Sequence, residues 1–385
     1  MTELRDRLAN AQVPGEAEAA ERSWQVVRTA FGQREPERAR RLPSLRLAAA
    51  ALALVVAGAA LAAATTSAGR DLVDELRRAV GIENARPALV SLPAPGRILV
   101  AGPGGAWVVD RDGGRRRLGA YREASWSPFG RFVVAVGADR RELVALEPGG
   151  DVRWSLARPG PVRLPRWGGT ETDTRIAYLA GRALRVVAGD GTGDRLLARR
   201  VGPAAPAWRP GAGHVLTFAG PADAIVTLDV DTGRELWRAP SPAPVRELQW
   251  SSDGRLLLVR TTGGLGLLDA RGRRRFELLG PEAAPAVDAA FAGDGVAFVQ
   301  WENGGSTVWL VPRLRPDRSA ARRIFEGAGR IDGVHPAPEG SWLLLPWTSA
   351  DQWVFVRTGA RPRVLGASNV SARFGSTAEI AGWCC

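Results

Sequence analysis

The sequence predicts an all-β fold, a seven-bladed β-propeller, preceded by a single transmembrane helix. A unit of about 41 residues recurs through most of the chain. Each copy resembles four short strands joined by turns rich in Gly. An apolar stretch of 18 residues without a charge lies before the repeats. Together these features predict a membrane-anchored propeller, in which each repeat forms one blade.

The repeat is measured from an aromatic residue that precedes a polar turn and an apolar strand. The aromatic positions Trp126, Trp167, Trp208, Trp250 and Phe291 are separated by 41, 41, 42 and 41 residues. One blade cannot bury both faces of its sheet, but blades stacked around an axis can, so we expect these aromatic side chains to pack between blades. A β-sandwich or solenoid of similar strands is the alternative.

The number of blades depends on how the last residues are used. Seven copies run from about Ser91 to Leu365, including weaker ones near Ser91 and His335. The fragment 369–383 has only enough residues for two strands. It either completes the first blade, as in rings that share strands from both termini, or starts an eighth, truncated blade. We choose seven blades.

The apolar stretch Leu47 to Ala64 is long enough to cross a bilayer as a helix, at about 1.5 Å per residue. Eleven of its eighteen residues are Ala. A buried Ala-rich helix and a cleaved secretory signal therefore remain as alternatives. Five Arg residues precede the stretch, at positions 34, 38, 40, 41 and 46. This charge distribution places the N-terminus in the cytoplasm and the repeats outside.

The chain therefore divides into four segments. We expect a helical cytoplasmic segment at 1–46, the transmembrane helix at 47–68, an amphipathic stalk helix at 69–87 and the propeller at 88–385. The first segment carries an apolar helical stripe, which makes it a candidate surface for a cytoplasmic partner. The stripe consists of Ala20, Trp24, Val27 and Phe31.

Composition limits the partners. The net charge is +12, and all 52 basic residues are Arg. These Arg residues are scattered among 40 acidic ones, so no nucleic-acid partner is expected, although attraction to anionic surfaces is. Cys384 and Cys385 are the only cysteines, which excludes a disulfide framework within the fold.

No pattern of residues predicts catalysis, a cofactor or a metal ion. His214 and His335 fall at blade turns, and neither has a second His or a Cys beside it. The carboxylates that recur in register are expected to cap turns; they are Asp229, Asp231, Asp253 and Asp269. The late blades are rich in Trp, and exposed Trp often anchors a partner.

Two motifs resemble known propellers. "WSPFGR" at 126–131 and "WSSDGR" at 250–255 resemble the blade motif of WD-repeat-like propellers of the TolB type. "LDVDTGRELW" at 228–237 resembles, more weakly, the repeat of quinoprotein-type propellers, a group with cofactor-free members. The resemblance covers about 88–365. It implies the architecture and does not imply an active site.

These observations favour a non-enzymatic scaffold in the bacterial cytoplasmic membrane, with the propeller outside the cell and bound to an unknown protein or envelope ligand. The first alternative is a transmembrane sensor. Its layout resembles that of membrane-bound anti-sigma factors, and Trp24, Val27 and Phe31 would hold the cytoplasmic partner. The second alternative is a propeller hydrolase or lyase, whose site would combine unlike titratable side chains on the axis.

Overall fold

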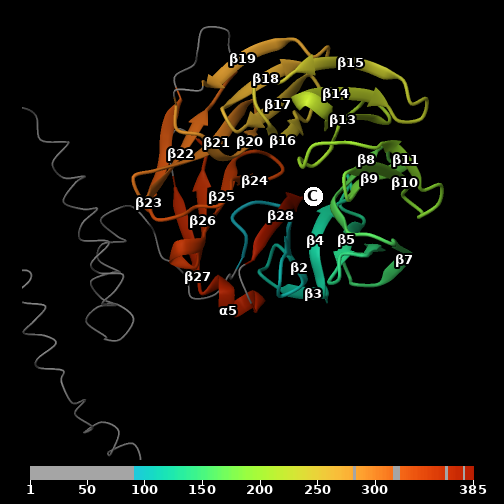
Figure 1. Ribbon diagram of the computed structural model, residues 1–385. Helices are drawn as coiled ribbons and strands as arrows, with labels where there is room; N and C mark the ends of the chain where they lie inside the picture. Colours follow the sequence, from blue (N-terminus) through green and yellow to red (C-terminus); the bar gives the residue numbers. More distant parts are fainter. Residues whose placement is uncertain (1–90, 281–282, 315–320, 360–362, 376–377) are drawn as a thin grey trace, which may run out of the picture. The chain divides into compact units, whose positions relative to one another are not determined.

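The computed structural model describes residues 91–280, 283–314, 321–359, 363–375 and 378–385. These residues form seven four-stranded antiparallel sheets arranged as a ring around a central axis (Figure 1). The propeller and its seven blades are therefore confirmed. The predicted segments 1–46, 47–68 and 69–87 lie outside the described residues.

In every sheet the strands follow one another from the axis outward. The first sheet holds β28 (Glu379–Cys384), β1 (Arg97–Ala101), β2 (Ala106–Val109) and β3 (Arg115–Gly119). The second holds β4 (Tyr121–Trp126), β5 (Val133–Gly137), β6 (Glu142–Leu146) and β7 (Val152–Ala157). The third holds β8 (Val162–Gly169), β9 (Thr174–Ala180), β10 (Ala183–Ala188) and β11 (Arg195–Ala198). The fourth holds β12 (Ala207–Trp208), β13 (Val215–Ala219), β14 (Ala224–Asp229) and β15 (Glu235–Pro240).

The remaining sheets follow the same order. The fifth holds β16 (Val245–Trp250), β17 (Leu256–Thr261), β18 (Gly264–Asp269) and β19 (Arg274–Leu279). The sixth holds β20 (Ala286–Ala292), β21 (Gly295–Glu302), β22 (Gly305–Val311) and β23 (Arg322–Ala328). The seventh holds β24 (His335–Pro336), β25 (Trp342–Trp347), β26 (Gln352–Arg357) and β27 (Val364–Ser368). Three short helices lie between strands: η1 (Pro221–Asp223), η2 (Thr348–Ala350) and α5 (Val370–Phe374).

The two ends of the propeller share one sheet. The last strand, β28, pairs antiparallel with β1, with Ile98 opposite Trp383. The fragment 369–383 thus completes the first blade. It contributes one strand and the short helix α5 rather than two strands. Asn369 and Gly375 flank α5 in left-handed conformations, and Phe374 packs inside, with its ring 5.1 Å from that of Trp353.

The hydrophobic core lies between neighbouring sheets. One cluster joins Val134 and Val136 of β5 to Ile176 and Tyr178 of β9, and all four side chains are fully buried. Removing such an aliphatic side chain from water contributes about 1.5–3 kcal/mol. Clusters of this kind also link the other neighbouring blades, so each blade depends on both of its neighbours.

The repeated aromatic residues pack between blades, as the sequence predicts. Trp126, Trp167 and Trp250 are buried at the ends of their innermost strands. The indole N–H of Trp208 donates to the Arg166 carbonyl oxygen of the preceding blade at 2.8 Å. That of Trp250 donates to the Thr217 hydroxyl, also in the preceding blade, at 3.1 Å. These residues therefore add a polar contact to the apolar contact between sheets.

The Gly of the repeated turn is required for the same packing. Gly254 and Gly340 adopt positive φ, 65° and 71°. A Cβ on Gly254 would lie 2.4 Å from the Pro210 carbonyl oxygen of the preceding blade. A Cβ on Gly340 would lie 2.3 Å from the Gly293 nitrogen of its preceding blade. Only Gly satisfies both the conformation and this close approach.

The recurring carboxylates cap turns at three of the four predicted positions. Asp229, Asp253 and Asp269 each accept hydrogen bonds from backbone N–H groups two to four residues later. Asp231 differs, because its carboxylate lies 2.5 Å from Nδ1 of His214 instead. Nε2 of His214 lies 3.0 Å from the Asp173 carbonyl oxygen, so this His bridges the third and fourth blades.

A buried ionic network holds the third blade together. The Asp194 carboxylate accepts from Arg158 at 2.6 Å, from Arg185 at 2.8 Å and from the Tyr178 hydroxyl at 2.7 Å. Burial alone would raise the pKa of Asp194, but the hydrogen bonds from Arg185 and Tyr178 hold it below its ordinary value. The carboxylate is therefore charged, and both of its oxygens accept hydrogen bonds within the protein.

We expect Asp194→Asn to lower the free energy of unfolding by about 3 kcal/mol, because it leaves two guanidinium groups without their buried counter-charge. Urea unfolding of the full chain, followed by Trp fluorescence, measures this change. The matched control is Glu171→Gln, which removes an ion pair with Arg131 whose side chains are about 60% exposed. That change should cost less than about 1 kcal/mol. Equal losses in the two variants would contradict the prediction.

Candidate functional site

In three innermost strands an acidic residue follows a β-bulge. In β4, β16 and β20 the pairing with the next strand shifts by one residue, as a β-bulge does, directly before Glu123, Glu247 and Asp288. A bulge re-aims the side chain that follows it. Each acid also lies three residues before the aromatic of its blade. This regular offset was the sequence signal for an axial cluster, and the sequence analysis missed it.

Two of these acids connect neighbouring blades. The Glu123 carboxylate accepts from the backbone N–H of Leu164 at 2.5 Å. The Asp288 carboxylate accepts from the backbone N–H of Val334 at 2.8 Å. Each acid therefore accepts from a backbone N–H group of the next blade. Leu164 lies in the innermost strand of that blade and Val334 lies directly before such a strand, and these N–H groups have no acceptor on a neighbouring strand.

Glu247 and Asp288 form a carboxyl pair on the axis. Their carboxyl groups are hydrogen-bonded to each other, and Arg260 donates to Glu247 at 2.8 Å. Burial, and then the charge of Asp288, raise the pKa of Glu247 to about 8. Burial also raises the pKa of Asp288. Two charged carboxylates in contact repel each other strongly, so the pair shares one proton at neutral pH.

His335 lies beside this pair. The structure places it in β24, the innermost strand of the seventh sheet, and not at a turn as the sequence analysis expected. A Cβ on Gly333 would lie 2.7 Å from its Nε2 and 2.9 Å from Oδ2 of Asp288, so Gly333 gives both groups room. Burial lowers the pKa of His335 to about 4. The imidazole is therefore neutral, and it has no hydrogen-bond partner among the residues that the structure describes.

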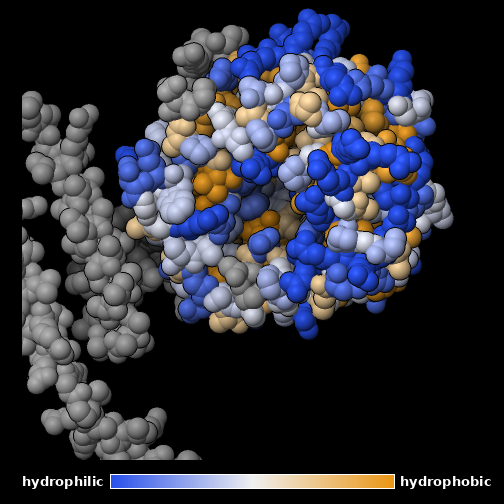
Figure 2. Space-filling model, viewed as in Figure 1, coloured by the Kyte–Doolittle hydropathy of each residue, from blue (hydrophilic) through white to orange (hydrophobic). Residues whose placement is uncertain are grey.

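Arg166 faces the axis from β8. Burial lowers the pKa of its guanidinium, while Glu123 and Glu247 act in the opposite direction. One of its N–H groups donates to the Pro165 carbonyl oxygen at 2.9 Å. Within the described ranges, no carboxylate lies within 4 Å of the guanidinium. Figure 2 shows that the ring is hollowed near its middle, with both hydrophilic and hydrophobic residues in the hollow.

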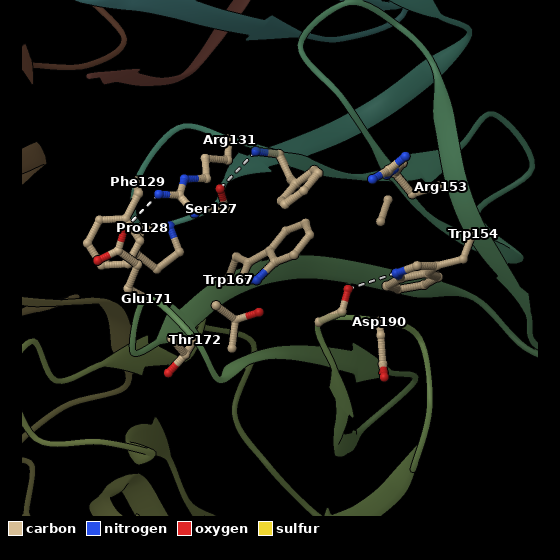
Figure 3. A pocket seen from close by; sticks show the side chains of 14 residues that line it. Ser127, Pro128, Phe129, Arg131, Arg153, Trp154, Trp167, Glu171, Thr172 and Asp190 are labelled. Atoms are coloured by element: carbon tan, nitrogen blue, oxygen red, sulfur yellow. Dashed lines mark hydrogen bonds and ion pairs between the residues drawn. The ribbon is translucent and has the colours of Figure 1, made fainter.

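A second candidate site is a cleft of about 440 Å³ between the second and third sheets. Aromatic side chains from both sheets line it, as Figure 3 shows; they are Phe129, Phe132, Trp154 and Trp167. The rings of Phe132 and Trp167 stack at 5.8 Å. Arg131 and Glu171 close one end as an ion pair, and the Trp154 indole N–H donates to the Gly189 carbonyl oxygen at 2.8 Å.

The cleft has unusually exposed apolar side chains beside it. Phe129, which lines it, is 48% exposed, and Val152, next to the lining residue Arg153, is 56% exposed. These are two of the four large hydrophobic residues exposed in the described part of the chain. The indole N–H of Trp167 is buried there without a hydrogen-bond partner in that part of the chain. The cleft therefore presents exposed apolar surface, whereas the indole N–H of Trp167 lies beneath that surface.

The Trp residues of the late blades are mostly structural. Trp342 and Trp353 are buried, and Trp309 and Trp347 are partly buried. Trp301 alone among these five is well exposed, at 47%, with the Arg330 guanidinium 5.8 Å from its ring. The remaining site residues predicted from sequence, Trp24, Val27 and Phe31, lie outside the described residues. Within 91–385, apart from the short gaps, no helix has the length and apolar character needed for a membrane span.

Comparisons with known proteins support the architecture. No family model and no curated protein matches this chain. Among solved structures, the chain resembles the C-terminal WD40 domain of Sif2, with a TM-score of 0.53, 13% identity and coverage of 71% of this chain and 83% of that one. It also resembles the Cps50 (Swd1) β-propeller domain of Myceliophteria thermophila, with a TM-score of 0.51, 14% identity and coverage of 66% and 87%.

A third similar structure is a putative 6-phosphogluconolactonase from Bacteroides uniformis, with a TM-score of 0.52, 13% identity and coverage of 75% and 98%. At such low identity these likenesses show the fold alone. The chain is thus a seven-bladed β-propeller with a WD40-like fold.

The axial groups predict how stability depends on pH. The shared proton on Glu247 and Asp288 stabilises the folded state fully below about pH 4.5, and this contribution is lost as pH rises towards 8. The neutral His335 acts in the opposite direction: its contribution is complete above pH 6.5 and is lost as pH falls towards 4. Above pH 6.5 the carboxyl pair therefore changes stability, whereas His335 does not.

We therefore expect the urea midpoint of the full chain to fall between pH 6.5 and pH 8, and to fall much less in Glu247→Gln, which cannot release this proton. Unfolding curves at several pH values across that range measure the slope. Asp253→Asn, an exposed turn cap outside the channel, is the control and should keep the slope of the unmodified protein. The same slope in Glu247→Gln would refute the prediction.

Proposed function

We propose that this protein is a non-enzymatic scaffold that holds a partner protein in the cleft between its second and third sheets. The observation that carries the proposal is Phe129, a large aromatic side chain left 48% exposed on a cleft lined by other aromatic residues. Large exposed aromatic residues beside a cavity are typical anchors of protein interfaces.

The chemistry of the cleft favours an extended segment of the partner with one large apolar side chain. That side chain would pack against Phe129 and the ring of Trp167. The Arg131 and Arg153 side chains are 61% and 57% exposed at the same cleft, so an acidic residue beside the apolar anchor would add a favourable contact.

The axial cluster is the observation that favours the alternative, a propeller enzyme. A propeller enzyme would combine unlike titratable side chains on the axis, and Glu247, Asp288 and His335 meet that condition. However, Asp288 accepts from a backbone N–H and Glu247 is paired with Arg260. In the described residues no hydroxyl or thiol group is hydrogen-bonded to His335, so no activated nucleophile supports this alternative.

The cleft proposal is tested by crosslinking in cells. A photo-crosslinking phenylalanine analogue is placed at position 129 and, as a control, at position 236, where Leu236 is exposed elsewhere. We expect one defined peptide of one partner to be captured at 129 and not at 236. A synthetic copy of that peptide should bind the purified full chain. Phe129→Ala should weaken the binding of this peptide about tenfold or more, as expected for an interface anchor.

Leu236→Ala should leave that affinity unchanged. Equal capture at the two positions, or equal affinity of the two alanine variants, would overturn the proposal.

We also propose that the propeller is anchored outside the cytoplasmic membrane by the span at 47–68. The support is the uncharged sequence from Leu47 to Ala64 and the Arg residues before it. The sensor alternative depends on the same topology, because its stripe of Trp24, Val27 and Phe31 must face the cytoplasm.

Protease added to intact spheroplasts tests this topology. It should degrade the propeller and leave a membrane-bound fragment that contains the N-terminal segment. Detergent-lysed cells control for protease resistance of the fold. A propeller that is protected in spheroplasts and degraded after lysis would show that the orientation is wrong.

A further inference from the structure

We infer that the axial channel is a binding site for a small hydroxylated carboxylate, such as a sugar acid or a hydroxy acid. In this arrangement Arg166 binds the carboxylate group, and Glu247, Asp288 and His335 bind the hydroxyl groups. This site is separate from the cleft and does not depend on the scaffold proposal.

The four side chains come from innermost strands that converge on the axis, although they belong to four blades. Arg166 lies on β8, Glu247 on β16, Asp288 on β20 and His335 on β24, the innermost strands of four different sheets. All four residues are partly buried, so each keeps some accessible surface. Because each lies on the innermost strand of its sheet, we take this surface to face the axis.

Arg166 is the strongest sign of an anionic ligand. A guanidinium group has five N–H donors, and this one donates once, to a carbonyl oxygen of its own strand. Enclosed cations are normally paired, because an unpaired charge is costly to remove from water. A carboxylate matches the planar fork of the guanidinium with two parallel hydrogen bonds.

The other wall of the channel favours hydroxyl groups. His335 is neutral, so its ring offers one donor and one acceptor, and neither is used within the described residues. The Glu247 and Asp288 pair holds one proton and has further acceptor positions. A second anionic group would be repelled by this pair, whereas an alcohol both donates and accepts. A neutral sugar would in turn leave Arg166 without a counter-charge.

The alternative is that Arg166 only offsets the charges of Glu123 and Glu247 across the channel, since both act on its pKa. The two explanations differ in what removal of the charge does. A purely structural Arg166 stabilises the fold, so its loss should lower stability. A ligand-binding Arg166 is an unsatisfied cation without ligand, so its replacement should keep or raise stability while it removes binding.

The test is calorimetric titration of the purified full-length protein at pH 6.5 with glucuronate and with glycerate. Glucose and glycerol, which lack the carboxylate, are the matched neutral compounds. We expect saturable one-to-one binding of at least one acid, with its neutral counterpart at least about tenfold weaker, as the loss of a charge-assisted pair predicts. Cyclohexanecarboxylate, a carboxylate without hydroxyl groups, should also bind at least about tenfold more weakly.

Arg166→Gln should weaken binding of the acid about tenfold or more without lowering the thermal midpoint of the protein. Glu247→Gln should also weaken binding of the acid. Phe129→Ala, which changes only the cleft, should leave acid binding unchanged and so separates this site from the scaffold proposal. Three results would overturn the inference: no saturable binding of either acid, equal binding of the neutral compounds, or a lower thermal midpoint in Arg166→Gln with unchanged acid binding.

Discussion

The structure depends on burial of apolar surface between neighbouring blades. A four-stranded sheet has two apolar faces in this ring, and each is covered only by the next blade, as in the cluster that joins β5 to β9. A row of blades would leave two faces exposed at its ends. The pairing of β28 with β1 removes those ends, because it makes the first blade from both termini of the propeller. Closure of the ring is therefore a condition for the stability of every blade.

The same closure determines what lies on the axis. Seven innermost strands converge there, and each has one edge without a strand partner. Backbone donors at these edges still require acceptors, which Glu123 and Asp288 supply to the next blade. The remaining polar groups are brought close together by the geometry of the ring rather than by mutual attraction. A carboxyl pair with a shared proton, a neutral His335 and an Arg166 without a carboxylate partner among the described residues result from this arrangement.

The sequence predicted the fold well because the repeat has a local cause. The spacing of the aromatic residues and the Gly of the turn reflect contacts that recur at every blade, such as that of Gly254 with Pro210. The axial cluster was not predicted, because Arg166, Glu247, Asp288 and His335 lie 41 to 169 residues apart and become neighbours only when the ring closes. The bulges that orient Glu123, Glu247 and Asp288 leave only a weak sequence signal, an acid three residues before an aromatic. Asp231 was misassigned because its partner His214 belongs to a different turn.

The two candidate sites differ in how they depend on the ring. The cleft belongs to one pair of blades, and its aromatic wall comes from turns and strands of the second and third sheets alone. Substitution of an exposed lining residue such as Phe129 changes a local surface, whereas Trp167 also belongs to the core between blades. The channel takes one residue from each of several blades, so its geometry exists only in the closed ring. Insertion of a blade would separate Arg166 from His335 but would leave the cleft as it is. A propeller of this kind therefore combines a surface that varies easily with an axial site whose geometry is tied to the number of blades.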